Sequence, residues 1–416
     1  MTNACAIGSE ASPEMDLLCA CVRPNRSGAA DMGSFRGRPM DWPRFLALAT
    51  NHHVVPLAYR ALKPAANLAA IIPPEWLAQL RSLHASIAAH NVRAMALLHR
   101  LQQRMESEGV QLVPIKGPAL ATLAYGDIAA RQFEDLDLVV RREDMLKAVG
   151  LLEQDGYELR ELSDGVCRKR YLATLQNWSL YKSGSPPLDL KPVLVSHALC
   201  GPSSADFIAS SCRRIAIDER RTLSVPKPEA MLLAVCMDGA NEMWFKLSSV
   251  ADVGALMAKF AADVDWHGFL GEAARLGQRR SVLVGACLAE ELLGCECPPA
   301  FRDGVRRDPA ARRLAAQAAE RLRTLAPRHA IIARQTWFAL QTRDRMRDRV
   351  RFMLRLMFVP GAFELDAVRL PGILYPLHSL MRPFRLAWDV LVRQGRHRRL
   401  TVRSADGKLP DMAQDA

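Results

Sequence analysis

Asp135 and Asp137 are the residues of this chain whose type and spacing best suit chemistry. They stand at the start of an apolar stretch, Leu136 to Val140, that the pattern predicts to be a β-strand. Side chains of a strand alternate between its faces, so both carboxylates project from one face while the leucines pack behind them. Two adjacent carboxylates repel each other unless a cation lies between them. Because Mg²⁺ prefers carboxylate and phosphate oxygens, the pair predicts a divalent-metal site.

Asp189 is the candidate for a third carboxylate. It lies in the alternating stretch Pro187 to Lys191, which we expect to form a strand beside the one that carries Asp135 and Asp137. Two ions about 3.5 to 4 Å apart can clamp a phosphate during in-line displacement, one activating an acceptor oxygen and the other neutralising a triphosphate. Asp189 would help to accept the acceptor's proton. A separation of more than about 8 Å between Asp189 and Asp135 would leave no shared metal.

Lys116 and Gly117 are candidates for phosphate binding. They follow the predicted strand Gln111 to Ile115 and precede a short helix, whose first turn suits Pro118. The glycine allows close backbone approach, and the N–H groups at a helix start favour phosphate. Lys116 and Arg131 would neutralise phosphate charge. The pattern Gly-x-x-x-x-Gly-Lys-[Ser/Thr] is absent from the sequence, which disfavours a P-loop kinase or ATPase.

Periodicity predicts an α+β protein, in which a small mixed sheet with helices is flanked by helical regions on both sides. The predicted elements of the central region are strands over residues 111–115, 136–140, 178–181 and 188–191, the last two forming a hairpin, and helices over 118–125 and 145–154. The chain divides into a weakly ordered N-terminus with a short helix over 14–22 (1–36), a helical region (37–109), an α/β core (110–225), a second helical region (226–392) and a basic, polar tail (393–416).

Composition limits the class of protein. The chain has 416 residues and is half hydrophobic, enough for two or three domains. Its net charge of +12 suits anionic partners such as nucleotides, nucleic acid or an acidic membrane surface, although an arginine-rich bacterial composition explains the same excess. The ten cysteines lack zinc-finger spacing, so we expect free thiols in a reducing cytoplasm. No signal peptide or membrane-spanning run is evident, and we expect a cytoplasmic protein.

The order of these motifs resembles the nucleotidyltransferases of the DNA polymerase β superfamily. In that superfamily, a strand, a glycine-containing turn and a helix precede a strand with two acids, and a third acid follows on a later strand. The likeness is closer to a bacterial group of uncharacterised nucleotidyltransferase family proteins, and it covers about residues 40–390. It rests on four stretches of this sequence: Lys116–Leu120, Tyr125–Asp127, Arg131–Val140 and Leu188–Leu190.

The resemblance implies a metal-dependent enzyme that moves a nucleoside monophosphate from an NTP to an acceptor hydroxyl or phosphate and releases pyrophosphate. The implied cofactor is Mg²⁺ or Mn²⁺, with two ions. The acceptor is a small molecule, a saccharide, a peptide or RNA. The implied metal-binding and catalytic residues are Asp135, Asp137 and Asp189, and the implied nucleotide-binding residues are Lys116, Gly117 and Arg131.

Two departures from the group's pattern bear on activity. Lys191-Pro192 stands where the group usually has His-Trp, and Asp238-Gly239 stands where a His-Gly pair is common. If the histidine that Lys191 replaces aids the acceptor site, this chain has altered substrate choice or reduced activity. The alternative function is therefore a catalytically weak or inactive accessory protein that keeps the fold. A factor that nucleotidylates protein or tRNA is a third possibility, distinguished by its acceptor.

Three further features have simpler interpretations. His52 and His53 are expected to be an exposed or capped pair rather than metal ligands. The arginine-rich helical stretch around Arg343 to Arg349 mixes acids with bases, which is typical of a solvated, salt-bridged face. The basic tail follows an apolar stretch, and this pattern suits weak contact with an anionic surface, either lipid or nucleic acid.

Overall fold

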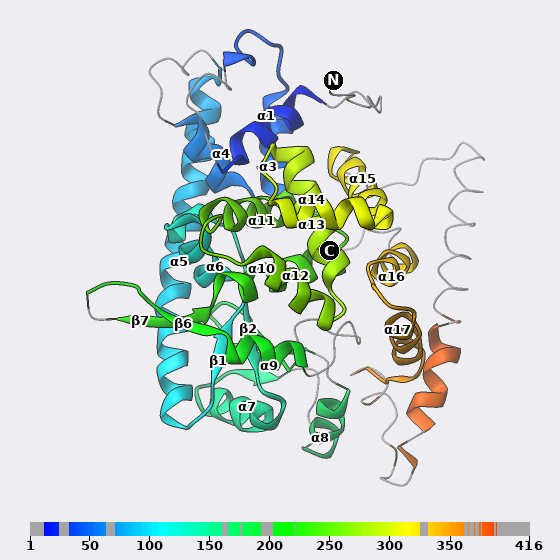
Figure 1. Cartoon of the computed structure of the whole chain (residues 1–416). Helices are drawn as coiled ribbons and strands as arrows, with labels where there is room; N and C mark the ends of the chain where they lie inside the picture. The colour runs from blue at the N-terminus through cyan, green and yellow to red at the C-terminus, as the bar shows by residue number, and fades with distance from the viewer. Residues whose placement is uncertain are drawn as a thin grey trace, which may run out of the picture.

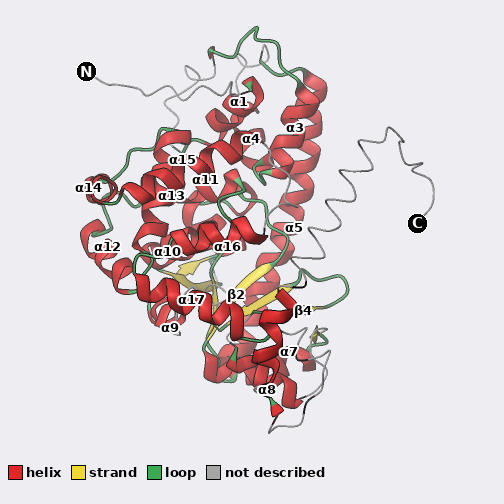
Figure 2. Ribbon diagram, turned by 90° about the vertical axis from the view of Figure 1, so that its right-hand side faces the viewer, coloured by secondary structure: helices red, strands yellow, loops and turns green. Residues whose placement is uncertain are grey.

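Helices make up most of the chain and surround one mixed sheet, in the computed structural model shown in Figures 1 and 2. The α+β prediction is confirmed. The structure describes residues 12–24, 33–63, 71–159, 165–174, 177–192, 203–219, 221–324 and 332–361, a helical piece over 377–386, and residues 365, 370, 374, 375 and 388. Residues 393–416, predicted to be a tail, lie outside this described part.

The N-terminal region is helical, as predicted, and its longest helix runs along one side of the molecule in Figure 1. It consists of α1 (Pro13–Val22), α3 (Trp42–Asn51), α4 (Val55–Leu62) and α5 (Pro74–Ser107). The short helix expected over residues 14–22 is therefore confirmed. Within this helix, Leu17 and Leu18 are fully buried. The apolar face of α1 packs against α3, α4 and the C-terminal helix α13, which no local pattern reveals.

The sheet has the strand order β1-β2-β5-β4-β3. Only β2 and β5 pair in parallel; the other neighbours are antiparallel. The strands are β1 (Leu112–Pro114), β2 (Leu136–Val140), β3 (Glu158–Leu159), β4 (Trp178–Tyr181) and β5 (Leu188–Lys191). All four predicted strands and the β4–β5 hairpin are confirmed. Every residue of β2 is buried, and the strand lies between β1 and β5 inside the sheet.

Short helical elements connect these strands. They are α6 (Gly117–Leu120), the π-turn η1 (Ala121–Tyr125), the 3₁₀ turns η2 (Ile128–Ala130) and η3 (Arg142–Asp144), α7 (Met145–Gln154), α8 (Gly165–Ala173) and α9 (Ser203–Ser210). The helices predicted over 118–125 and 145–154 are confirmed. A second hairpin, β6 (Cys212–Ala216) with β7 (Thr222–Pro226), was not predicted. Its first strand has no fully buried residue, so the apolar alternation that marks a strand is missing there.

The C-terminal region is helical, as predicted; in Figure 1 its first helices lie above the sheet and its last two, α16 and α17, lie to the right of it. Its helices are α10 (Pro228–Asn241), α11 (Leu247–Lys259), α12 (Trp266–Arg275), α13 (Arg279–Leu293), α14 (Pro299–Arg307), α15 (Pro309–Thr324), α16 (Ile332–Gln341) and α17 (Met346–Phe358). None of the helices in the described part is long and apolar enough to cross a membrane.

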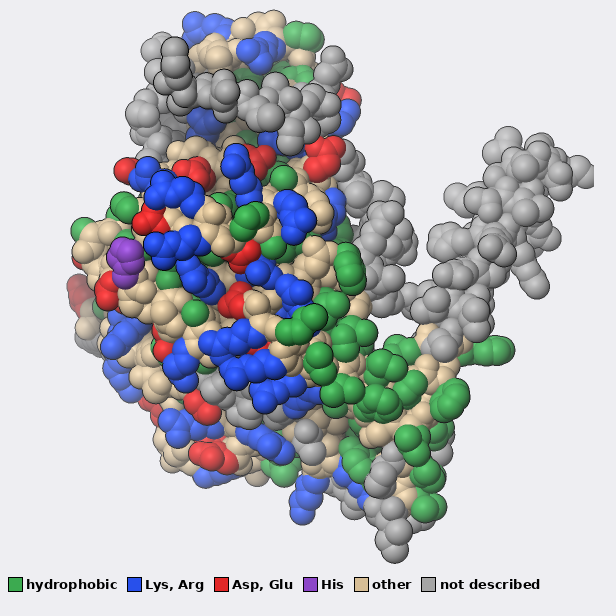
Figure 3. Space-filling model, turned by 45° about the vertical axis from the view of Figure 1, so that its right-hand side comes forward, with side chains coloured by type: hydrophobic (Ala, Val, Ile, Leu, Met, Phe, Trp, Pro, Cys, Tyr) green, Lys and Arg blue, Asp and Glu red, His purple; other side chains and the backbone are tan. Residues whose placement is uncertain are grey.

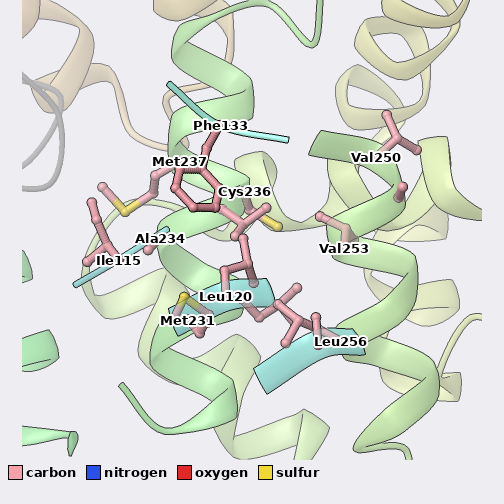
Figure 4. Packing of buried hydrophobic residues seen from close by; sticks show 14 of the residues in the cluster. Ile115, Leu120, Phe133, Met231, Ala234, Cys236, Met237, Val250, Val253 and Leu256 are labelled. Atoms are coloured by element: carbon pink, nitrogen blue, oxygen red, sulfur yellow. The ribbon is translucent and has the colours of Figure 1, made fainter. Parts of the chain in front are cut away.

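The helix α10 joins this region to the sheet. Figure 4 shows its buried Met231 and Cys236 beside Leu120 and Phe133 of the sheet region, with Leu256 of α11 close by. A Cβ atom on Gly239 would lie 2.6 Å from the ring of Trp244. The absence of a side chain there lets the indole pack against α10. One continuous hydrophobic core therefore includes both the sheet and the helical region.

The arginine-rich stretch predicted to be a solvated face begins in the turn between α16 and α17 and continues into α17. That prediction was wrong for Arg343, which is 1% exposed and lies over the ring of Phe352. Asp344 accepts the backbone N–H groups of Arg279 and Arg280, each at 2.9 Å, at the start of α13. The turn therefore caps the N-terminus of α13. This contact brings the charged residues of the turn into the interior of the protein.

The cysteines that the structure describes are free thiols, as expected. Burial raises the pKa of the Cys19 thiol to about 12 and that of Cys212 to about 11, because a thiolate loses its solvation inside the protein. Such thiols are poor nucleophiles at neutral pH. The free cysteines of the described part are Cys19, Cys21, Cys212, Cys236, Cys287, Cys295 and Cys297.

Candidate functional site

The parallel pairing of β2 with β5 brings the three predicted acids together. Asp137 lies opposite Asp189 in the register, and Asp135 precedes β2 by one residue. Ligand oxygens of Asp135, Asp137 and Asp189 all lie within 4.8 Å of one another. This separation is below the limit of about 8 Å given above, so the acids are close enough to share a metal. Asp189 also accepts a hydrogen bond of 2.7 Å from the hydroxyl of Ser179, its neighbour on β4.

The charges of the acid cluster are only partly balanced. Burial raises the pKa of Asp135 to about 6, and the nearby carboxylates of Asp137 and Asp189 add to the rise. Burial acts in the same direction on Asp137, but Lys191 and Lys116 outweigh it and hold the pKa of Asp137 well below its ordinary value. A divalent cation fits this donor set, since it would relieve the repulsion that Asp135 experiences.

Two lysines contact the middle acid. The Nζ of Lys191 contacts Oδ1 of Asp137, and the Nζ of Lys116 lies 3.5 Å from its Oδ2. Lys116 also contacts a fourth acid, Asp238 of α10. Burial lowers the pKa of both lysines, but the aspartates outweigh it and raise these pKa values above 10.5. Both oxygens of Asp137 therefore face an ammonium group, which a metal ion would have to share or displace.

Replacing Lys191 with methionine is expected to strengthen Mn²⁺ binding by about tenfold or more. The substitution removes a positive charge in contact with Asp137. This charge would repel a metal ion bound to the same carboxylate, and two like charges about 4 Å apart repel by a few kcal/mol in a partly solvated site. Titration of Mn²⁺, followed by the loss of its free-ion electron paramagnetic resonance signal, measures the affinity. The matched control is Lys147→Met on the surface of α7, which should leave it unchanged. Weaker binding in Lys191→Met would show that Lys191 orients Asp137 for the metal instead of competing with it.

A cleft of about 460 Å³ surrounds these side chains. One wall comes from the sheet and the segment that leads into it, and the opposite wall comes from α10 and the start of α11. The candidate residues Lys116, Gly117, Arg131, Asp135, Asp137 and Asp189 all line it. The helical region contributes polar groups to the same cleft, namely Asp238, Asn241, Glu242, Lys246, Ser248 and Ser249.

Gly117 makes the turn that directs Lys116 into the cleft. Its φ of +58° is the left-handed conformation that favours glycine, and a Cβ atom there would lie 3.4 Å from the side chain of Leu136. Lys116 itself is extended, between β1 and α6. The Lys-Gly pair therefore changes the direction of the chain at the edge of the acid cluster, as its place in the predicted motif requires.

Arg131 lines the cleft but is held from the side of the helical region. Its Nε donates to Asp252 of α11 at 2.9 Å, and the hydroxyl of Tyr125 donates to the same carboxylate at 2.8 Å. Burial lowers the pKa of Arg131, but Asp252 outweighs it and raises this pKa above its ordinary value. Asn91 of α5 donates to the carbonyl of Arg131 at 2.7 Å. Tyr125 and Arg131 are thus both anchored to the buried carboxylate of Asp252, and Arg131 is also tied to α5.

The two histidines are separated by the fold. His52 is the C-cap residue of α3 and accepts a hydrogen bond of 3.4 Å from the backbone N–H of Leu247. It is 3% exposed, so of the two predicted states, exposed or capped, it takes the capped one, with the start of α11 packed over it. His53 has a φ of +56° and lines the cleft. Within the described part, the metal-type cluster is made of aspartates alone.

His52 is expected to make folding stability depend on pH. Burial lowers its pKa to about 4, from the ordinary 6.5, so the folded state holds the neutral form. The contribution of His52 to the free energy of unfolding is fully present above pH 6.5. It is lost as pH falls from 6.5 to 4, because the unfolded chain binds a proton on His52 at a higher pH than the folded chain does. Between pH 7 and 4.5, wild type should lose about 2 kcal/mol more of its unfolding free energy than His52→Gln, measured by urea denaturation. The control is His267→Gln, a substitution of an exposed histidine, which should keep the wild-type dependence of unfolding free energy on pH. The same wild-type dependence in His52→Gln would contradict the prediction.

The sequence did not assign Lys191, Ser179 or Asp238 to the site. Lys191 follows Asp189 by two residues on β5, so strand alternation already placed both on one face. Asp238 was identified only as a departure from the group's pattern, although a charged residue after the apolar run from Met231 to Met237 is itself a signal. The partners of Ser179 depended on the hairpin register, which the sequence left open.

Comparisons with known proteins identify the family of the chain. A scan against protein families matches residues 38–294 to a family described as uncharacterised nucleotidyltransferase. A search of curated proteins found no match. Among solved structures, an antigenic nucleotidyltransferase-like protein from Paracoccidioides brasiliensis is similar, at 14% identity and a TM-score of 0.31, over 54% of this chain and 92% of that one. Since the family match includes more than half of the chain, the protein belongs to this uncharacterised nucleotidyltransferase family.

Proposed function

We propose that this protein transfers a nucleoside monophosphate from an NTP to an acceptor oxygen. The observation that carries the proposal is the cluster of three carboxylates, within 4.8 Å of one another, in a polar cleft of a nucleotidyltransferase family member. In the reaction, the acceptor oxygen bonds to the α-phosphorus, the bond to the β-phosphate oxygen breaks, and pyrophosphate leaves. The acceptor's proton passes to a base at the site.

The residues of the chain divide this work. Asp135, Asp137 and Asp189 would hold Mg²⁺ or Mn²⁺, as two ions in our proposal. A bound ion would neutralise charge on the phosphates and activate the acceptor. Asp189, hydrogen-bonded to Ser179, is the candidate to take the acceptor's proton. Lys116 is placed beside the acids by Gly117, and its ammonium would hold a phosphate oxygen.

Arg131 contributes charge to the same cleft. Its guanidinium is fixed by Asp252, so its contribution to phosphate binding would be preorganised, without loss of side-chain freedom on binding. The acceptor is the open part of the proposal. The cleft wall formed by α10 and α11 is polar, with the hydroxyls of Ser248 and Ser249, and this chemistry suits a hydrophilic acceptor.

A labelling assay tests the proposal. The purified protein is incubated with each of the four α-³²P-labelled NTPs and Mg²⁺ or Mn²⁺, with and without cell lysate, beside the double variant Asp135→Asn/Asp137→Asn. Label on an acceptor, absent with the double variant, is the expected result, and its chemical class identifies the acceptor. No transfer, no NTP binding and no metal dependence would count against the proposal.

A second candidate is a binding or accessory protein that keeps the fold without the activity. The observation that favours it is the contact of both Asp137 oxygens with lysines, which balances that acid without a metal. For such a protein, Asp135→Asn and Asp137→Asn would leave the cellular role intact. The labelling assay and the cellular role of the two variants therefore separate the candidates.

A further inference from the structure

The helix α17 exposes an apolar stripe to solvent. Its residues recur at intervals of three and four, so they lie on one side of the helix. Their exposed fractions run from 36% to 71%, whereas core residues of this protein are below a tenth. The members are Met346, Val350, Met353, Leu354, Met357 and Phe358. An amphipathic helix normally buries such a side, and here only Phe352, on the other side, is buried.

A second stripe lies on the helical piece over residues 377–386 and continues to residue 388. It has the same spacing, and Phe384 and Trp388 are 78% and 68% exposed. Its members are Leu377, Leu380, Met381, Phe384 and Trp388. The piece is attached to α17, since Nε of Arg382 donates to the carbonyl of Leu356 at 2.9 Å. Figure 3 shows hydrophobic side chains gathered over one part of the surface, where these elements lie.

Arginines border the apolar surface. Helical spacing places Arg347, Arg351 and Arg355 along one edge of the stripe on α17, and Arg349 along the other. Between residues 343 and 399 the sequence has thirteen arginines and five acidic residues. Most of the net charge of +12 therefore belongs to this part of the chain. The long apolar stems of arginine can follow apolar surface while the guanidinium groups reach phosphate groups.

We propose that this apolar, arginine-bordered surface of α17 and residues 377–388 docks on an anionic lipid surface. Large exposed apolar side chains would enter the boundary between headgroups and acyl chains, with arginines at the level of the lipid phosphates. The tryptophan at the end of the second stripe suits this boundary, because its ring combines an apolar body with a polar N–H. Charge complementarity favours a lipid surface over a protein, since arginine flanks both edges instead of matching acids at defined positions. The docking is independent of the proposed transfer reaction.

Sedimentation with sucrose-loaded vesicles tests the docking. The full chain is mixed with vesicles of phosphatidylcholine alone, or of phosphatidylcholine with phosphatidylglycerol. We expect sedimentation with the anionic vesicles and little with the neutral ones, and a fall in the bound fraction at high salt. The variant Leu354→Ser/Phe384→Ser should lower the partition coefficient by about tenfold or more, because it removes buried apolar area. Arg351→Gln should lower it by about fivefold.

Matched controls distinguish the surface from general effects. Leu83→Ser/Val92→Ser removes two exposed apolar side chains from α5, and Arg81→Gln removes an exposed arginine from the same helix. Both should bind vesicles like wild type, and an unchanged melting temperature shows that each variant is folded. Vesicle binding that persists in Leu354→Ser/Phe384→Ser, or equal binding to neutral vesicles, would overturn the proposal. A third outcome would also overturn it: wild type does not bind vesicles but forms a dimer, and among the variants only Leu354→Ser/Phe384→Ser dissociates that dimer. This outcome would assign the surface to contact with a second copy of the chain.

Discussion

Asp137→Asn is expected to lower nucleotide transfer by about a thousandfold or more. Asp137 is the buried member of the acid cluster, and it stands opposite Asp189 in the register of β2 and β5. An amide in its place is a weak ligand for a hard cation. Loss of a metal that stabilises transition-state charge by several kcal/mol corresponds to a factor of that size. The measurement is the initial rate of label transfer at saturating Mn²⁺.

The substitution also leaves Lys116 and Lys191 without the charge that both contact, so folding must be measured beside activity. A circular dichroism melting curve separates an inactive folded variant from an unfolded one. The charge-matched control is Glu143→Gln, whose carboxyl group is exposed just after β2, and it should retain the wild-type rate. Wild-type transfer by a folded Asp137→Asn would show that the acid cluster is not the metal site of the reaction.

Asp252→Ala is expected to destabilise the protein by about 3–5 kcal/mol. The carboxylate is 1% exposed and accepts hydrogen bonds from both Tyr125 and Arg131. Its removal leaves the buried guanidinium of Arg131 without its counter-charge, and breaking a buried pair in this way has a cost of about that size. Urea denaturation at neutral pH measures the change. Arg131 borders the candidate cleft, so NTP affinity should fall as well.

Two comparisons sharpen the result for Asp252. In Asp252→Asn, the side chain keeps its size and one hydrogen-bond acceptor, so a smaller loss is expected and the difference reports the charge. The control is Glu106→Ala, which breaks the solvent-exposed pair with Arg214 and should change stability by less than about 1 kcal/mol. A loss of that small size in Asp252→Ala would mean that water reaches Arg131 and replaces the carboxylate.

The sequence predicted those parts of the site that local patterns encode. The alternation around Asp137 and Asp189 fixed which face each acid takes, and the pairing of the two strands then brought them together as predicted. The turn at Gly117 was predictable because only glycine readily adopts its backbone conformation. Their roles in metal and nucleotide binding remain predictions that the labelling assay tests.

The ion pairs were beyond the reach of the sequence. Lys116 contacts Asp238, and Arg131 contacts Asp252, each pair separated by more than a hundred residues. Such contacts depend on how α10 and α11 pack on the sheet, and periodicity carries no information about the partner of a side chain. The burial of His52 and Arg343 was missed for the same reason, because it depends on packing against α11 and α17.

The placement of Asp238 and Asp252 on the helical region changes the meaning of the predicted boundary near residue 225. A fragment that ends there would keep the three clustered acids, including Asp137 beside Lys116, but would lose Asp238 and Asp252, the partners that the helical region supplies to Lys116 and Arg131. Arg131 would then lack its carboxylate partner, and Lys116 would keep Asp137 alone. In evolutionary terms, the sheet and the helices α10 and α11 are therefore expected to be inherited together. A recombinant that took its helical region from a distant relative would need acids at positions 238 and 252 to pair with Lys116 and Arg131.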